Sequence, residues 1–301
     1  MDKPVYLPFT ETQWQLRMGL KPLNLHDWIE IDNEFVFYLD RKIDLLQHHY
    51  SSVFASLPGS EVGQKEVLDL LLNYLPERFP EYYQRHNQQI TNQITQQTWN
   101  INEFADNPLD LAGRLVQEDL CLMQANSDSY ILSAASVCFP LHWQLRDKLG
   151  HPIAQIHAPV PGYAEKLERP VNDLFDRLRP DRPGYRLNWS FVDTPELFLG
   201  YHRNSQPTAI TVDNARDTLW FRVERQTLRR LEKSNGILFG IRTYLYPLSI
   251  LETEKTIAHT LSAILQQMPI GMQQYKNLLP LRDAILGYLN RISQDDLNTT
   301  R

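Results

Sequence analysis

Three histidines that could bind a metal lie in one short stretch, residues 138–163, with the sequence CFPLHWQLRDKLGHPIAQIHAPVPGY. They are His142, His151 and His157, and imidazole is a common ligand of transition metals. Their spacing matches no zinc or non-haem iron signature, and Asp147 is the only carboxylate between them. On spacing alone, the pattern is more typical of hydrogen-bonded or solvated histidines than of a three-histidine metal site.

One of the three, His157, lies on a stiff stretch of backbone. In IHAPVPGY, Pro159 and Pro161 each fix their own φ and favour an extended preceding residue. Gly162 then permits a turn with positive φ. A histidine on such a segment points in one direction at little further cost in entropy, which suits a ligand of a metal or of haem iron.

The overall composition is that of a soluble globular protein. The chain has 301 residues, 42% of them hydrophobic, and a formal net charge of −6 with acidic and basic residues interspersed. This balance predicts a sizeable core and argues against nucleic-acid binding through a broad basic face. The N-terminus lacks a basic region followed by an apolar run, and no apolar run reaches membrane-spanning length. We therefore expect a cytoplasmic protein without a membrane segment.

Motifs for bound electron carriers are missing from the sequence. The two cysteines, Cys121 and Cys138, have apolar neighbours, which predicts buried thiols and leaves too few ligands for an iron–sulfur cluster. There is also no Gly-rich dinucleotide fingerprint, no phosphate loop and no Gly-x-Ser-x-Gly motif. If the protein performs redox chemistry, its electrons must come from elsewhere.

The pattern of apolar residues predicts an α+β fold in one domain, an antiparallel sheet with helices at both ends of the chain. Strands are expected at 34–39, 129–139, 184–192, 217–231 and 237–248, and helices at 61–75, 108–123, 164–178, 252–268 and 279–292. The polar stretch 84–100 is expected to form a loop or hairpin. Residues 1–110 would then form an N-terminal wrap and helices, 111–250 the sheet core, and 251–296 the C-terminal helices.

The two longest expected strands form a hairpin, because EKSNG between them ends in Asn-Gly. Polar residues alternate along both strands: Arg222, Glu224 and Gln226 on the first, and Arg242, Tyr244 and Tyr246 on the second. We expect the two sets to share one face, with Phe221, Val223 and Ile241 on an apolar opposite face. Glu224 between arginines would stay ionised and could hold a small cation, although a solvated face with cross-strand ion pairs is the commoner outcome.

Two further segments carry polar residues of interest. Arg186 and Trp189 would lie on opposite faces of the strand YRLNWSF. Arg186 could bind an anionic group such as a propionate, whereas a tryptophan in this position is more often core than cofactor wall. In the second expected helix, Arg114 and Glu118 are four residues apart, which favours an intrahelical ion pair over a contribution to a pocket wall.

Several of these segments, in this order, resemble the alpha-subunit family of haem-dependent oxidative N-demethylases. They are RLVQEDL (114–120), CFP (138–140), IHAPVPGY (156–163), NWS (188–190), RVERQTLRRL (222–231) and ILFGIRTY (237–244). The resemblance extends from RMGLKPL (17–23) to YKNLLPLRDAILGYL (275–289). It implies a PAS-like sheet that encloses haem b, and oxygen-dependent demethylation of a small secondary amine such as dimethylamine to methylamine and formaldehyde. It also implies that separate flavin and iron–sulfur reductase subunits supply the electrons.

The resemblance implies cofactor-binding roles for residues on several of these segments. His157 would be the axial ligand of the haem iron, and His142 is the weaker candidate. The other expected cofactor contacts are Arg186, Lys148, Tyr163 and Trp189, the first two through the haem propionates.

On the distal side of the haem, Arg222 would stabilise dioxygen and Glu224 would hold the ammonium group of the substrate. Two alternatives to an enzyme are a haem-binding PAS-like sensor or carrier without turnover, and a haem-free binding subunit.

Overall fold

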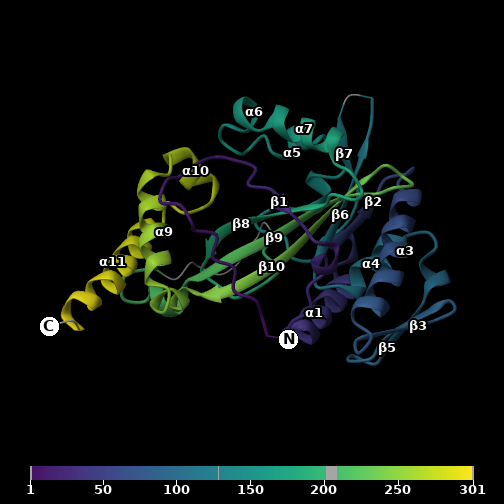
Figure 1. The fold of residues 1–301 in the computed structure, drawn as a ribbon, viewed down its shortest axis with the longest axis horizontal. Coiled ribbons are helices and arrows are strands. Elements are labelled where there is room, and N and C mark those ends of the chain that lie inside the picture. Colours follow the sequence, from purple (N-terminus) through teal and green to yellow (C-terminus); the bar gives the residue numbers. More distant parts are fainter. Residues whose placement is uncertain (1, 128, 201–208, 300–301) are drawn as a thin grey trace.

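The computed structural model describes residues 2–127, 129–200 and 209–299, and its centre is one large antiparallel sheet (Figure 1). The strand order is β1–β8–β9–β10–β6–β7–β2. The strands are β1 (Lys21–Pro22), β2 (Phe54–Ser56), β6 (Asp119–Ala125), β7 (Tyr130–Ser136), β8 (Gly184–Val192), β9 (Trp220–Arg230) and β10 (Ile237–Pro247). The polar stretch expected to form a hairpin gives a second, three-stranded sheet, β3 (Tyr83–His86), β4 (Gln89–Asn92) and β5 (Gln97–Asn100). The predicted α+β class is confirmed.

Helices cover both faces of the large sheet (Figure 1). They are α1 (Phe35–His48), α2 (Tyr50–Val53), α3 (Glu61–Arg78), α4 (Pro108–Leu115), α5 (Ile153–Ile156), α6 (Tyr163–Lys166), α7 (Glu168–Arg177), α8 (Ala215–Thr218), α9 (Lys255–Gln267), α10 (Ile270–Tyr275) and α11 (Arg282–Thr299), with short 3-10 helices at Leu25–Asp27, Ile101–Phe104, Leu145–Asp147 and Leu248–Glu252. Leu238 of β10 packs in the cluster that contains α1, α3 and α4, and Tyr244 packs with α9 and α11. Phe239 and Ile241, on the alternate face, pack with α5 and α7.

Two expected elements have a different structure. Residues 34–39, expected as a strand, form the start of α1, because the buried side chains continue at helical spacing through Lys42, Leu45 and Leu46. The expected helix 108–123 ends at Leu115, and β6 follows. Leu120 and Leu122 pack in the cluster of α1, α3 and α4, and Cys121 and Met123 pack in the cluster of α5 and α7, so both faces of β6 are buried. Its continuous apolar run therefore cannot be told from a helix by periodicity.

The register of the β9–β10 hairpin corrects the expected sheet face. The hairpin forms as EKSNG predicted, and it places Glu224 opposite Thr243 and Arg242 opposite Arg225. Because directly opposed residues of an antiparallel pair share a face, Glu224 and Arg242 lie on opposite faces. The prediction that the two polar sets share one face is therefore wrong, and Ile241 lies on the face of Glu224. A change of register by one residue moves every side chain to the other face, and the sequence pattern left that register open.

The N-terminal strap, defined here as residues 2–20, passes around the edge of the sheet at β8 (Figure 1). Phe9 is buried on one face, with its ring centroid 5.1 Å from that of Phe221. Leu20 packs in the cluster on the other face, and Leu16 reaches Gly162 at the start of α6. The strap therefore joins the two layers that the sheet separates.

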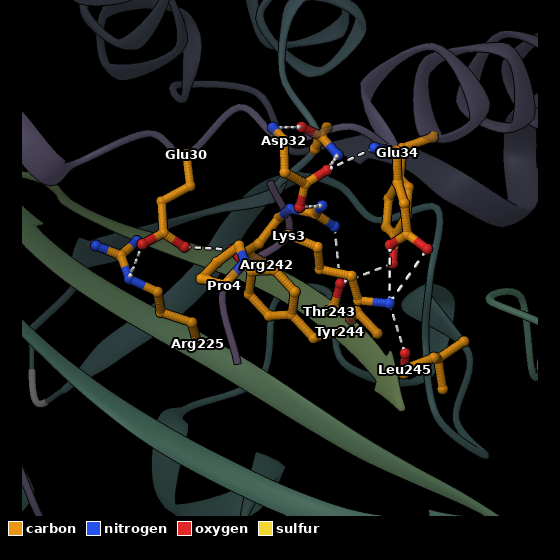
Figure 2. A network of polar contacts seen from close by, with 12 residues as sticks. Lys3, Pro4, Glu30, Asp32, Glu34, Arg225, Arg242, Thr243, Tyr244 and Leu245 are labelled. Carbon is orange, nitrogen blue, oxygen red and sulfur yellow. Dashed lines mark hydrogen bonds and ion pairs between the residues drawn. The ribbon is translucent and has the colours of Figure 1, made fainter. Parts of the chain in front are cut away.

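A buried polar network fixes the beginning of this strap (Figure 2). Arg242 Nη2 donates a hydrogen bond to Asp32 Oδ2 at 2.8 Å, and neither side chain is more than 1% exposed. Lys3 Nζ donates to Leu245 O at 2.6 Å and forms an ion pair with Glu34 at 3.0 Å. Because charged groups are stable in a core only when paired, the network ties the strap and the segment before α1 to β10.

Both cysteines are buried and neither forms a disulfide. Burial raises the pKa of Cys138 to about 12 and raises that of Cys121 further, so both are neutral thiols at physiological pH. The prediction that both thiols are buried is confirmed.

Candidate functional site

A cavity of about 990 Å³ lies between the large sheet and the layer of α5, α6 and α7. Sheet residues on its wall include Cys121, Arg186, Asn188, Glu224, Gln226, Phe239 and Ile241, and helical-layer residues include Ile153, His157, Tyr163 and Val171. The strap and α10 close the remaining sides. Small-molecule pockets usually measure about 300–1,000 Å³, so this cavity has room for a ligand at the large end of that range.

His157 is half-buried on the cavity wall, directly after the last residue of α5. Its Nδ1 lies 2.9 Å from the carbonyl oxygen of Ile153. Since a carbonyl only accepts, Nδ1 carries the proton and Nε2 keeps its lone pair, for which no hydrogen-bond donor is found among the described residues. Burial lowers the pKa of His157, and the nearby cations Arg186 and Lys148 lower it further. The imidazole is therefore neutral, which is the form that binds a metal ion.

The backbone around His157 has the geometry that the prolines and glycine predicted. Gly162 has φ +78°, in the left-handed region, and directly precedes α6. The turn brings Tyr163 back onto His157, with ring centroids 5.0 Å apart and planes 12° from parallel. The ring of His157 is thus held by a hydrogen bond on one edge and by an aromatic face.

Four side chains on β8 and β9 form a polar patch on the sheet side of the cavity. The register places Arg186 opposite Gln226 and Asn188 opposite Glu224, all on one face. Glu224 Oε2 accepts hydrogen bonds from Gln226 Nε2 at 2.9 Å and from Asn188 Nδ2 at 3.3 Å. Glu224 is therefore oriented by two neutral amides and by the guanidinium of Arg222, whose Nε lies 3.9 Å from Glu224 Oε1. It is the acidic residue expected from the sequence.

Lys276, just after α10, also reaches this patch, although it was not among the residues expected from the sequence. Its Nζ donates to Asn188 Oδ1 at 3.2 Å and to Trp189 O at 2.7 Å. Burial lowers the pKa of Lys276 to about 8; the charge of Arg186 acts in the same direction, and that of Glu224 opposes it. No periodicity marks this lysine, since α10 has only six residues. The one signal for it is its place in YKNLLPLRDAILGYL, a segment that carries the resemblance.

Lys148 and Arg186 lie on different sides of the cavity. Lys148 Nζ donates to Ile156 O at 2.9 Å, so it belongs to the His157 side. Arg186 projects from β8, and its Nε is buried without a hydrogen-bond partner among the described residues. Burial lowers the pKa of both groups.

Arg222 makes the contacts of a structural core residue. It is fully buried, and it donates to Leu197 O at 3.0 Å and to Phe139 O at 2.5 Å. Arg222 does not belong to the described residues that line the cavity. Its expected catalytic role stays a prediction.

Trp189 borders the cavity but points to the sheet face opposite Glu224. There it makes an edge-on contact with Phe9, at a centroid distance of 5.1 Å. Its expected contact with a cofactor also stays a prediction, and its neighbours are those of a core residue.

The other two histidines do not join His157 in a metal site. His142 lines the cavity and has a positive φ of 58°, whereas His151 is not among the described lining residues. Within residues 2–127, 129–200 and 209–299, no three His, Cys, Asp or Glu side chains cluster so as to hold a metal ion.

The comparison with protein families gives one match. A family model described as haem-dependent oxidative N-demethylase, alpha subunit-like, matches residues 19–286, which include β8, β9, β10, α5, α6 and α10. In the part of the chain that the structure describes, no helix has both the length and the apolar character needed to cross a bilayer.

Proposed function

The chain belongs to the haem-dependent oxidative N-demethylase alpha-subunit-like family, and from this membership we propose that it binds haem b in the cavity and oxidatively demethylates a small secondary amine of the dimethylamine type. We also propose that the sheet is PAS-like, that His157 is the axial ligand of the iron, and that separate flavin and iron–sulfur proteins deliver the electrons.

The observation that carries the proposal is the hydrogen bond from His157 Nδ1 to Ile153 O. Histidines that bind a metal through one ring nitrogen commonly donate the N–H of the other to a backbone carbonyl, which fixes the tautomer and the ring orientation. The stacked ring of Tyr163 restrains the same imidazole from one face. A histidine with a satisfied Nδ1, a neutral ring and a position on a large cavity is a suitable axial ligand.

The remaining residues of the cavity fit haem in size and charge. The volume of about 990 Å³ is much larger than an amine of a few non-hydrogen atoms requires. Apolar side chains such as Phe239, Ile241 and Ile153 would contact the porphyrin. Arg186 and Lys148 are cations on the wall, and the buried Arg186 Nε without a partner is suited to a propionate.

The bound haem would supply the chemistry of dioxygen activation. Per turnover, dimethylamine, dioxygen, two electrons and two protons give methylamine, formaldehyde and water. The role of the chain is to bind and orient the amine: Glu224 would hold the dimethylammonium ion, and Asn188 and Gln226 hold the carboxylate. The polypeptide carries two buried thiols and no dinucleotide fingerprint, which supports external reductases as the source of the two electrons.

The test is an absorbance spectrum of the full chain after reconstitution with haem. We expect a strong Soret band for wild type, its loss or a large shift in His157→Ala, and an unchanged band in His142→Ala. A Soret band that is the same in His157→Ala would remove this residue as ligand. A Soret band without amine-dependent oxygen uptake in the presence of a reductase would favour a sensor or carrier, and no band at all would favour a haem-free binding subunit.

A further inference from the structure

Three half-buried cations line the cavity without an acidic partner: Lys148, Arg186 and Lys276. None of them forms an ion pair within 4.0 Å of a carboxylate of the described residues. Lys148 Nζ donates a hydrogen bond to the carbonyl oxygen of Ile156, on the His157 side of the cavity. The other two lie at β8, and among the described residues Glu224 is the carboxylate whose charge acts on both of them. Since an unpaired charge is costly in a partly buried position, two adjacent cations point to an anionic ligand.

The Arg186 guanidinium has unused donors. Its Nε is buried and has no hydrogen-bond acceptor among the described residues, and none of its three nitrogens forms an ion pair with a carboxylate there. The β8–β9 register puts its side chain on the cavity face, beside Asn188. A planar fork that faces a cavity binds a carboxylate through two parallel hydrogen bonds.

Lys276 has a third proton available beside that fork. Two of its protons serve Asn188 Oδ1 and Trp189 O, and its Nζ lies 4.8 Å from the centroid of the Trp189 ring. These contacts hold the ammonium in place against Asn188, which is two residues from Arg186 on the same strand face. The charge of Arg186 contributes to lowering the pKa of the Lys276 ammonium, and an anion bound by both groups would oppose this effect.

We propose that Arg186 and Lys276 together form a binding site for a single carboxylate group in this cavity, a site that rests on the function proposed above and extends it to Lys276. A carboxylate fits better than a phosphate, because Glu224 lies against the same patch and would repel a doubly charged anion. The planar carboxylate also matches the arginine fork.

This carboxylate has two sources. One is a propionate of the porphyrin. The other is the substrate itself, if it is an N-methylated amino acid. A single residue, Asn188, bridges Lys276 and Glu224 by hydrogen bonds of 3.2 Å and 3.3 Å. A small zwitterion could therefore place its carboxylate at Lys276 and its ammonium group at Glu224. The test therefore needs one probe for each source.

The experiment measures thermal stabilisation and affinity of the purified, haem-free full chain with matched probes. Metal-free protoporphyrin IX is compared with its dimethyl ester, and N,N-dimethylglycine is compared with dimethylamine. The variants are Arg186→Met and Lys276→Met, with Lys276→Arg as the charge-retaining variant and Lys21→Met as a control at the cavity mouth. Folding of each variant is checked by its unfolding temperature without ligand.

For wild type we expect the member with a free carboxylate to bind more tightly than the member without one, in at least one of the two probe pairs. Arg186→Met and Lys276→Met should each weaken that member about tenfold, Lys276→Arg should largely restore it, and Lys21→Met should leave it unchanged. If the methionine variants lose the preference for protoporphyrin IX over its dimethyl ester, the site binds a propionate. If they lose the preference for N,N-dimethylglycine over dimethylamine, the site binds the substrate.

The proposal is overturned if wild type prefers neither of the probes with a free carboxylate, or if the preference survives both methionine variants. None of the four probes contains iron, so these results are independent of whether His157 binds haem. A chain that gives no Soret band but binds N,N-dimethylglycine through Arg186 and Lys276 would reject the haem function and keep the carboxylate site.

Discussion

The imidazole of His157 stacks on the phenol ring of Tyr163, with centroids 5.0 Å apart, and the two residues are separated by the turn that Pro159, Pro161 and Gly162 form. The stack depends on the left-handed Gly162, because this residue reverses the chain and starts α6 with Tyr163. The arrangement restrains the imidazole plane before any ligand arrives. Its value for the proposed axial ligand is that little rotamer entropy remains to be lost on binding.

Replacing His157 by glycine should leave a gap that free imidazole can fill. We expect His157→Gly to lose the Soret band of the reconstituted protein, and imidazole at millimolar concentration to restore a band close to that of wild type. His142→Gly is the matched control and should keep its band without imidazole. If imidazole changes the His157→Gly spectrum no more than it changes that of free haem, the ligand assignment is wrong.

Removing the ring of Phe9 should release the strap from the sheet. Phe9 is 1% exposed and contacts Trp189 and Phe221, each at a centroid distance of 5.1 Å. Burial of a Phe side chain contributes roughly 1.5–3 kcal/mol, so Phe9→Ala should speed amide hydrogen exchange in the strap by at least about tenfold. The exchange of β9 and β10 should change much less. Val5→Ala, at an exposed position, is the control, and equal exchange in the two variants would contradict the anchoring role of Phe9.

The buried ion pair of Asp32 and Arg242 should be critical for folding stability. Asp32→Ala leaves the Arg242 charge buried without its acidic partner, which typically costs about 3–5 kcal/mol. Urea unfolding should therefore show a large fall in the free energy of unfolding, whereas Glu196→Ala, in an exposed pair with Arg41, should lose less than about 1 kcal/mol. Equal losses in the two variants would show that water or a rearranged neighbour solvates Arg242.

Lys276 should make the stability of the ligand-free protein depend on pH in the alkaline range. Burial lowers its pKa to about 8, whereas a lysine in an unfolded chain titrates near 10.4. Between these values the unfolded chain binds more protons than the folded one, so the free energy of unfolding rises with pH. Below about pH 8 both states are protonated, and the cost of the buried cation is present in full.

The measurement is the difference in unfolding free energy between wild type and Lys276→Met across this range. We expect it to change in favour of wild type by up to about 3 kcal/mol from about pH 8 to about pH 10. Taking the difference between the two unfolding free energies cancels the contributions of the tyrosines and lysines that titrate in both proteins. A difference that does not vary with pH would mean that Lys276 is solvated in the folded state.

The sequence by itself determined the features that depend on local chemistry and on segment order. The prolines and glycine around His157 fix that turn through their own φ angles, and Asn-Gly ends the β9–β10 connection as expected. The family assignment rests on several segments in a fixed order, and the family match over residues 19–286 confirms it. The apolar neighbours of the cysteines predicted their burial because burial follows from local hydrophobicity.

Only the tertiary structure decided which polar residues meet. The strand register turns Arg242 to the sheet face on which it meets Asp32, and turns Glu224 and Asn188 to the other face. A strand pattern alone cannot fix a register. Arg222 and Glu224 share a sheet face and form an ion pair at 3.9 Å. The guanidinium also donates to carbonyls of distant segments, and the carboxylate lines the cavity. Lys276 joins the patch because a short helix far along the chain places it against β8, and such long-range packing leaves no periodic trace in the sequence.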